Sequence, residues 1–216
     1  MDKLTARQVT RDPEKKTRMI LKAARKEFAK TGYDGARVDK IAAASKLSKG
    51  LIYHHFKSKD YLFQAVLEQM YKELSEENEV LYLEEFEPEA GVKRLIEHTF
   101  DYFVKNPEFI AVVNAENLLK GRHVKKSSFV GKSFEPLRLS LTKLLEKGAE
   151  QGIFRPGVNS TELYISIVGL GYFYLSNSHT LGVVFEANLT NSDAIAARKI
   201  HITELVIGYL RSPLEA

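Results

Sequence analysis

Apolar positions recur at helical spacing along most of the chain, and this pattern predicts an all-α protein. Ile20, Ala24 and Phe28 are four residues apart, and Pro13 suits the opening turn of a first helix that ends near Gly32. Further helices are expected from residue 58 onward and over residues 90–105, 107–119, 134–152, 160–178 and 192–211. No strand-like alternation of useful length and no internal repeat appears. Together with the two short helices described next, the pattern predicts about nine helices.

Residues 36–63 predict two short helices joined by a tight turn, followed by a longer helix. One face of the first short helix is apolar or small: Val38, Ile41, Ala42 and Ser45. Ser48 is a suitable N-cap for the second, which turns Ile52 and Phe56 inward. The outward positions are cationic, aromatic or small: Lys49, Gly50, Tyr53, His54 and Lys57. Such a face suits the major groove of DNA, where a recognition helix meets base edges and phosphates.

This segment resembles the helix-turn-helix of the tetracycline-repressor (TetR) family of bacterial regulators. The matching positions are Gly32, Tyr33, Val38, Ile41, Ala42, Ser48, Gly50, Ile52, Tyr53, His55, Phe56, Ser58, Lys59, Asp60 and Leu62. Arg37 replaces the usual Ser or Thr of the family, and Leu51 replaces a frequent Thr. Lys46 stands where the turn usually has glycine, so a left-handed backbone there would carry a modest strain.

The resemblance implies a set of DNA-binding residues: Arg37, Ser48, Lys49, Gly50, Leu51, Tyr53, His54, Lys57 and Lys59. By this match Tyr53 contacts a phosphate through its hydroxyl, and His54 reaches a phosphate or a base edge. Lys59 opens the long helix, whose free N–H groups favour a phosphate. Simple solvation is the alternative for each lysine.

The charge distribution agrees with a basic head and a larger, acidic remainder. Residues 1–60 hold 16 of the 32 Lys and Arg but only 7 of the 28 Asp and Glu. Positive charge on this segment attracts phosphate over long range, although residues 3–16 could equally form a solvated arm. We therefore expect residues 1–57 to form the arm and DNA-binding domain, and residues 58–216 to form the linker helix, effector-binding and dimerisation domain. The predicted core of the head is Ile20, Phe28, Val38, Ile41, Leu47, Ile52 and Phe56.

The last two helices are unusually apolar. Residues 163–185 contain no Lys, Arg, Asp or Glu, but only residues 163–175 are strongly apolar, which is short of the roughly 20 that a membrane span needs. Ile195, Ile202 and Tyr209 recur every seven residues, as in a helix–helix seam, and ordinary intrachain core would give the same pattern. The family resemblance implies that these helices form a homodimer interface. The residues expected there are Leu163, Ile167, Leu170, Ile195, Ile202, Leu205, Val206 and Tyr209.

The remaining bundle mixes aromatic with polar residues, a composition that could line a ligand pocket or simply form core. The candidate effector-binding residues are Phe100, Phe103, Asn114, Asn117, Tyr164, Tyr172 and Phe173. Residues 105–109 and 114–123 are loosely similar to a TetR subgroup that includes regulators of pyrimidine or nicotinate catabolism. This similarity favours a planar or carboxylated metabolite as the effector.

Several other functions are disfavoured. The chain has no cysteine, so disulfides, thiolate metal sites and a cysteine nucleophile are excluded. The fragments that resemble catalytic or phosphate-binding motifs lack required residues, so no enzyme activity, cofactor or metal is expected. No signal peptide is apparent, and a cytoplasmic, nucleoid-associated location is expected.

The favoured interpretation is a ligand-responsive repressor that binds a near-palindromic double-stranded DNA operator as a homodimer and is released by a small molecule. One rival is a non-specific, nucleoid-type DNA-binding protein. The other is a small-molecule-binding protein or enzyme without DNA affinity. The sequence does not encode the operator, the target genes, the effector or the direction of the response.

Overall fold

The computed structural model describes residues 13–211, and the terminal segments 1–12 and 212–216, including the predicted N-terminal arm, lie outside the described residues. The described part folds into ten α-helices and two short 3-10 helices, with no strand among these residues. The predicted all-α class is confirmed. The chain divides into two compact units: residues up to 70 together with 111–128, and residues 71–110 together with 129–216. The functional boundary at residues 57 and 58 stays a prediction.

The first unit contains the helix-turn-helix. Its elements are α1 (Pro13–Gly35), α2 (Val38–Ser45), α3 (Lys49–Phe56), the first part of α4 (Lys59–Glu79), the last part of α6 (Pro107–Leu118) and η2 (Val124–Lys126). The buried core of the head is Ile20, Phe28, Val38, Ile41 and Ile52, joined by Leu62 and Phe63 of α4. The predicted core residues Leu47 and Phe56 are only partly buried, because they lie at the ends of short elements. The first helix breaks at its predicted end, because Gly32 leaves helical geometry (φ 69°, ψ −179°), and a short helical segment follows across this kink to Gly35.

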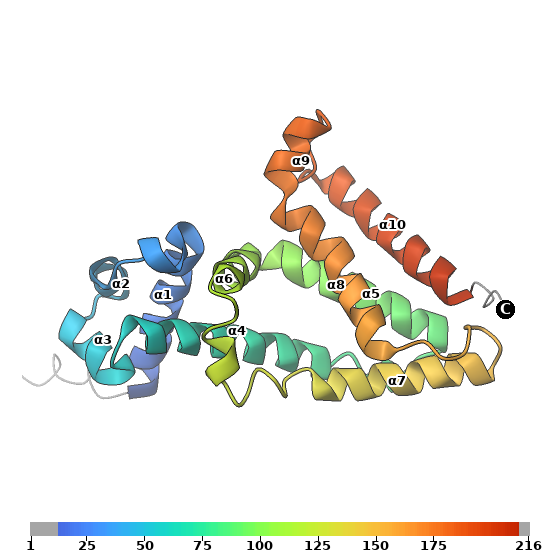
Figure 1. Ribbon diagram of the computed structural model, residues 1–216, viewed down its shortest axis with the longest axis horizontal. Helices are drawn as coiled ribbons and strands as arrows, with labels where there is room; N and C mark the ends of the chain where they lie inside the picture. The colour runs from blue at the N-terminus through green and yellow to red at the C-terminus, as the bar shows by residue number, and fades with distance from the viewer. Residues whose placement is uncertain (1–12, 212–216) are drawn as a thin grey trace, which may run out of the picture. The chain divides into compact units, whose positions relative to one another are not determined.

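The second unit is a helical bundle built around α5 (Pro88–Lys105), which packs against α7 (Glu135–Glu150), α8 (Ser160–Ser176) and α10 (Ser192–Arg211). The 3-10 helix η1 (Leu83–Glu85) also packs on α5 and α7. Figure 1 shows α8 leading to α9 (Ser178–Val184) and α10 returning beside α8. The approach of α8 to α5 is close at Gly171, where an added Cβ would lie 3.1 Å from a ring carbon of Phe100 and the ring would have to shift slightly.

One helix more is present than the sequence predicted. The helix expected over residues 160–178 ends at Ser176, because Asn177 leaves helical geometry (φ −108°, ψ 11°), and α9 then begins at Ser178. Across residues 13–211, none of the helices combines the length and the apolarity that a membrane crossing requires.

The residues predicted for the dimer face lie in two environments. Leu163, Ile167, Ile202 and Val206 are at most 4% exposed and belong to the core of the second unit. These four side chains pack mainly within their own chain. The neighbouring Leu205 and Tyr209 are 47% and 46% exposed, and Leu170 and Ile195 are partly buried. The interface itself stays a prediction.

Candidate nucleic-acid interface

The turn between α2 and α3 has the geometry that the sequence predicted. Lys46 adopts the left-handed conformation (φ 57°, ψ 31°), in which its N–H donates to the Ala43 carbonyl and the N–H of Leu47 donates to that of Ala42. The Ser48 hydroxyl then accepts the N–H of Leu51 at 3.2 Å and caps α3. Local side-chain and backbone bonds therefore fix the angle at which α3 leaves the turn.

The outer face of α3 is open to solvent. Lys49, Gly50, Tyr53, His54 and Lys57 are all exposed, with Tyr53 at 39%, whereas Ile52 is buried and holds the helix on the head. Of the other residues predicted to bind DNA, Arg37 and Ser48 are also exposed, and Leu51 and Lys59 are partly buried. A Cβ on Gly50 would meet no atom within 4 Å, so packing within the chain does not require a glycine there.

Two of the candidate lysines have partners within the chain, which sequence reasoning missed. The Lys49 ammonium lies 2.9 Å from Asp39 Oδ1, and this hydrogen bond raises the pKa of Lys49 above its usual value. Lys59 donates to the Asp34 carbonyl at 3.2 Å and lies 4.8 Å from the centroid of the Tyr33 ring. Any phosphate contact by Lys49 competes with Asp39. Lys59 also links the start of α4 to the end of α1.

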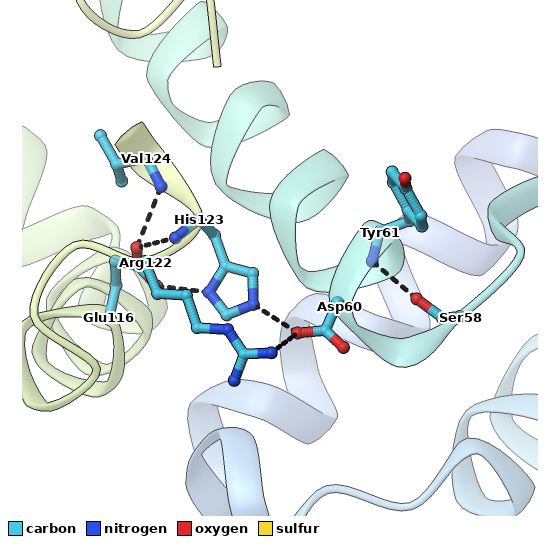
Figure 2. A network of polar contacts seen from close by, with 7 residues as sticks. All are labelled: Ser58, Asp60, Tyr61, Glu116, Arg122, His123 and Val124. Atoms are coloured by element: carbon cyan, nitrogen blue, oxygen red, sulfur yellow. Dashed lines mark hydrogen bonds and ion pairs between the residues drawn. The ribbon is translucent and has the colours of Figure 1, made fainter. Parts of the chain in front are cut away.

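A buried ionic network joins the first turn of α4 to α6 and the loop that follows it. Glu116 Oε1 accepts the backbone N–H groups of His123 at 2.6 Å and Val124 at 3.0 Å, and Oε2 lies 2.7 Å from His123 Nδ1. On the opposite side of the ring, His123 Nε2 lies 3.1 Å from Asp60 Oδ1, which Arg122 also contacts at 2.8 Å. Figure 2 shows the imidazole held between the two carboxylates.

The network also sets the protonation of Asp60. Burial would raise the pKa of Asp60, but hydrogen bonds from His123 and Tyr33 and the charge of Arg122 outweigh it and hold the pKa below its usual value. The sequence did not indicate this contact, because nothing local connects His123 to a carboxylate 63 residues away.

The candidate effector residues are divided between the two units. Phe100 and Phe103 are buried in the second unit, as part of the aromatic packing around α5. In the same unit, Tyr172 donates to the Ile110 carbonyl at 3.1 Å, and Tyr164 borders a cavity of about 130 Å³. Phe173 is 59% exposed and points its ring to the surface. The two asparagines, 114 and 117, lie in the first unit, and the second of them is exposed.

The described residues offer little for metal chemistry: in residues 13–211, no three His, Cys, Asp or Glu side chains are grouped so that they could hold an ion.

The fold and the exposed face of α3 together define an all-α, helix-turn-helix DNA-binding protein. The comparison with known families agrees. Residues 20–66 match the model described as bacterial regulatory proteins, tetR family, and residues 88–206 match the tetracyclin repressor-like C-terminal domain. The chain belongs to the TetR family of transcriptional regulators, so it is a regulator and not an enzyme.

Relatives place the chain in the same family. The HTH-type transcriptional repressor NicS of Pseudomonas putida is 35% identical over 196 residues, which cover 89% of this chain and 91% of that protein. The regulator YerO of Bacillus subtilis is 30% identical over 207 residues, or 93% of this chain and 68% of YerO.

Two solved structures share the fold. A TetR-family regulator from Mesorhizobium loti has a TM-score of 0.65 at 19% identity, covering 91% of this chain and 95% of that one. The regulator FadR of Bacillus subtilis, solved in complex with stearoyl-CoA, has a TM-score of 0.63 at 18% identity, covering 89% and 98%.

Proposed function

We propose that this protein is a transcriptional repressor that binds a near-palindromic operator as a homodimer and is released by a small-molecule effector. The observation that carries the proposal is the outer face of α3, where a cationic, aromatic and small surface stands on a capped, rigidly packed helix. Arg37, Tyr53, His54 and Lys57 are the exposed side chains that would reach phosphates or base edges. The relative NicS is a named repressor, which supports repression over activation.

The proposed dimer uses the apolar surface that α8 and α10 leave uncovered. Ile165, Phe173, Ile200, Leu205 and Tyr209 are each about half exposed or more, an unusual density of apolar side chains for a surface in contact with water. Leu205 and Tyr209 also border a hollow of about 170 Å³ that a side chain of a second copy can fill. A two-fold dimer would present two copies of α3 to successive major grooves of an inverted repeat.

Effector release follows as a two-state switch. The FadR structure, solved in complex with stearoyl-CoA, supports small-molecule binding by a protein of this fold. An effector releases DNA only if it binds more tightly to the conformation in which the spacing of the two recognition helices does not match the DNA than to the DNA-binding conformation. Moving the balance from 1:99 to 99:1 needs about 5.5 kcal/mol of differential affinity. A regulator that acts in this way on bacterial DNA works in the cytoplasm, so the expected location follows from the proposed activity.

Selection from a randomised duplex library at about 150 mM salt, without added ligand, tests the proposal. We expect enrichment of a short inverted repeat. Tyr53→Phe should then weaken binding to that operator without unfolding the protein, whereas Tyr82→Phe, which removes an exposed hydroxyl in the second unit, should bind like the unmodified chain. Uniform, salt-sensitive recovery would instead support the nucleoid-type protein, and recovery of no DNA would support a binding protein without DNA affinity.

A further inference from the structure

The second unit contains a small cavity whose lining combines aromatic rings with buried polar atoms. The cavity has a volume of about 130 Å³, and Tyr71, Asn78, Ser133, Phe134 and Tyr164 are among the residues that border it. These residues come from the end of α4, from α8 and from the segment before α7. A wider hollow of about 320 Å³ shares Asn78 and Ser133 with it, so the two spaces adjoin at these residues.

One buried polar atom at this cavity, Asn78 Oδ1, has no hydrogen-bond partner within residues 13–211. The Asn78 side chain and Thr99, which lies on α5 outside the cavity lining, both hydrogen-bond to the Tyr164 hydroxyl. Burial raises the pKa of Tyr164 to about 12 even though Asn78 and Thr99 act to lower it, so the phenol keeps its proton and can both donate and accept. Buried polar groups in native proteins are nearly always hydrogen-bonded, so this cluster is suited to a bound polar group.

The cavity has the dimensions of one aromatic ring. Phe134 and Tyr164 stack with their centroids 4.4 Å apart and their planes 28° apart, which gives the wall a flat aromatic surface. A cavity of about 150 Å³ lined by apolar side chains binds benzene, and the present cavity has a similar volume. A single six-membered ring fits, and its substituent would meet the polar end at Asn78.

The charges around the cavity disfavour an anion. The described lining residues of the cavity and the adjoining hollow include no Lys, Arg or His, whereas the hollow is bordered by Glu79, Glu84 and Glu85. A hydrogen bond from Lys143, followed by one from Ser140, lowers the pKa of Glu84, which is therefore ionised at neutral pH. A carboxylate entering from this side would meet negative charge, and the cation beside the hollow, Lys143, is already engaged by Glu84 at 3.2 Å.

We propose that this cavity binds the uncharged, planar end of the effector: a single aromatic or heteroaromatic ring bearing an amide-like group that donates and accepts hydrogen bonds. Asn78 Oδ1 accepts a hydrogen bond from the N–H of the ligand, and the Tyr164 hydroxyl donates one to the carbonyl oxygen of the ligand. The inference rests on the proposed function, since it assigns the effector of that same repressor. It narrows the sequence-based expectation, because it retains a planar ligand and disfavours a carboxylated one.

Benzamide and benzoate form a matched pair of probes, because they share size and shape and differ in charge and in the N–H donor. Isothermal titration calorimetry on the full-length protein should show benzamide binding at least about tenfold more tightly than benzoate. Asn78→Leu and Tyr164→Phe should each weaken benzamide binding by about tenfold or more. The melting temperature of each variant is measured beside its affinity, because Asn78→Leu also removes the hydrogen bond between Asn78 and Tyr164.

Tyr174→Phe is the matched control, since Tyr174 lies on the same helix and its hydroxyl donates elsewhere, to the Leu189 carbonyl at 2.9 Å. This variant should bind benzamide like the unmodified chain. The proposal is overturned if benzamide does not bind up to its solubility limit, if benzoate binds as tightly, or if neither Asn78→Leu nor Tyr164→Phe weakens binding. Library selection on the same protein distinguishes failure of the ligand proposal from failure of the proposed function. If an operator is enriched but benzamide does not bind, only the ligand proposal is contradicted. If benzamide binds but no operator is enriched, only the proposed repressor function is contradicted.

Discussion

Replacing Glu116 by leucine should destabilise the protein strongly, because one carboxylate satisfies three buried donors. Glu116 is 3% exposed and accepts two backbone N–H groups, from His123 and Val124, while its second oxygen faces the ring of His123, which is 1% exposed. Each buried donor left without an acceptor costs about 1–3 kcal/mol. Breaking one side of a buried ionic contact costs about 3–5 kcal/mol. We therefore expect Glu116→Leu to lower the free energy of unfolding by about 3–5 kcal/mol.

The Glu116→Gln substitution removes the charge of the side chain and keeps its size and shape. The amide oxygen can still accept both backbone N–H groups, and the amide nitrogen takes the place of the oxygen that faces His123 Nδ1, so mainly the charge-assisted part of the bonding is lost. The expected cost is about 1–2 kcal/mol, because hydrogen bonds to charged groups are roughly twice as strong as neutral ones.

Chemical denaturation in guanidinium chloride at neutral pH, followed by far-UV circular dichroism, measures both losses. Glu146→Leu is the control: Glu146 is exposed on α7, and its replacement should change stability by no more than about 0.5 kcal/mol. A cost below about 1 kcal/mol for Glu116→Leu, or equal costs for the leucine and glutamine variants, would refute the reasoning.

Three further predictions follow from single positions. Gly50→Ala should stabilise the free protein by up to about 1 kcal/mol, since its Cβ meets nothing, and should weaken operator binding by about tenfold, because the added methyl lies where α3 would approach DNA. Gly148→Ala places a Cβ 2.1 Å from a ring carbon of Phe154 and should cost about 1–3 kcal/mol in thermal unfolding, whereas Gly169→Ala, which meets no atom within 4 Å, should not show this loss.

The third prediction concerns stability at low pH. The pKa of Asp60 in the folded protein lies below its unfolded value of 3.8. The contribution of Asp60 to the free energy of unfolding is therefore full above that pH and is lost as the pH falls through the folded pKa. Asp60→Asn should therefore flatten the fall of stability below about pH 4, and a slope identical to that of the unmodified chain would contradict this assignment.

The helix-turn-helix could be predicted from the sequence almost completely, because its geometry depends on neighbouring residues. The Ser48 cap, the left-handed Lys46 and the proline starts of α1, α5 and α6 all depend on bonds or steric limits within a few residues. The outward face of α3 was likewise predictable from its period, because the one buried anchor, Ile52, determines which side faces solvent.

The packing partner of each apolar stripe was not predictable. The heptad spacing of α10 correctly marked an apolar face, but Ile202 and Val206 pack inside the chain while Leu205 and Tyr209 remain on the surface. Helical periodicity identifies an apolar face but does not identify the element that packs against it. A subunit interface and an intrachain core therefore have the same sequence pattern.

By itself, then, the sequence determined the helices, the DNA-reading head and the family. The tertiary structure decided which residues meet across long separations: the pairing of His123 with Asp60, 63 residues apart, and the gathering of Asn78, Phe134 and Tyr164 around one cavity. The physical reason is that caps, turns and helical periods are local properties of the chain. Burial, ion pairing and cavity lining depend on three-dimensional neighbours, which no local pattern encodes.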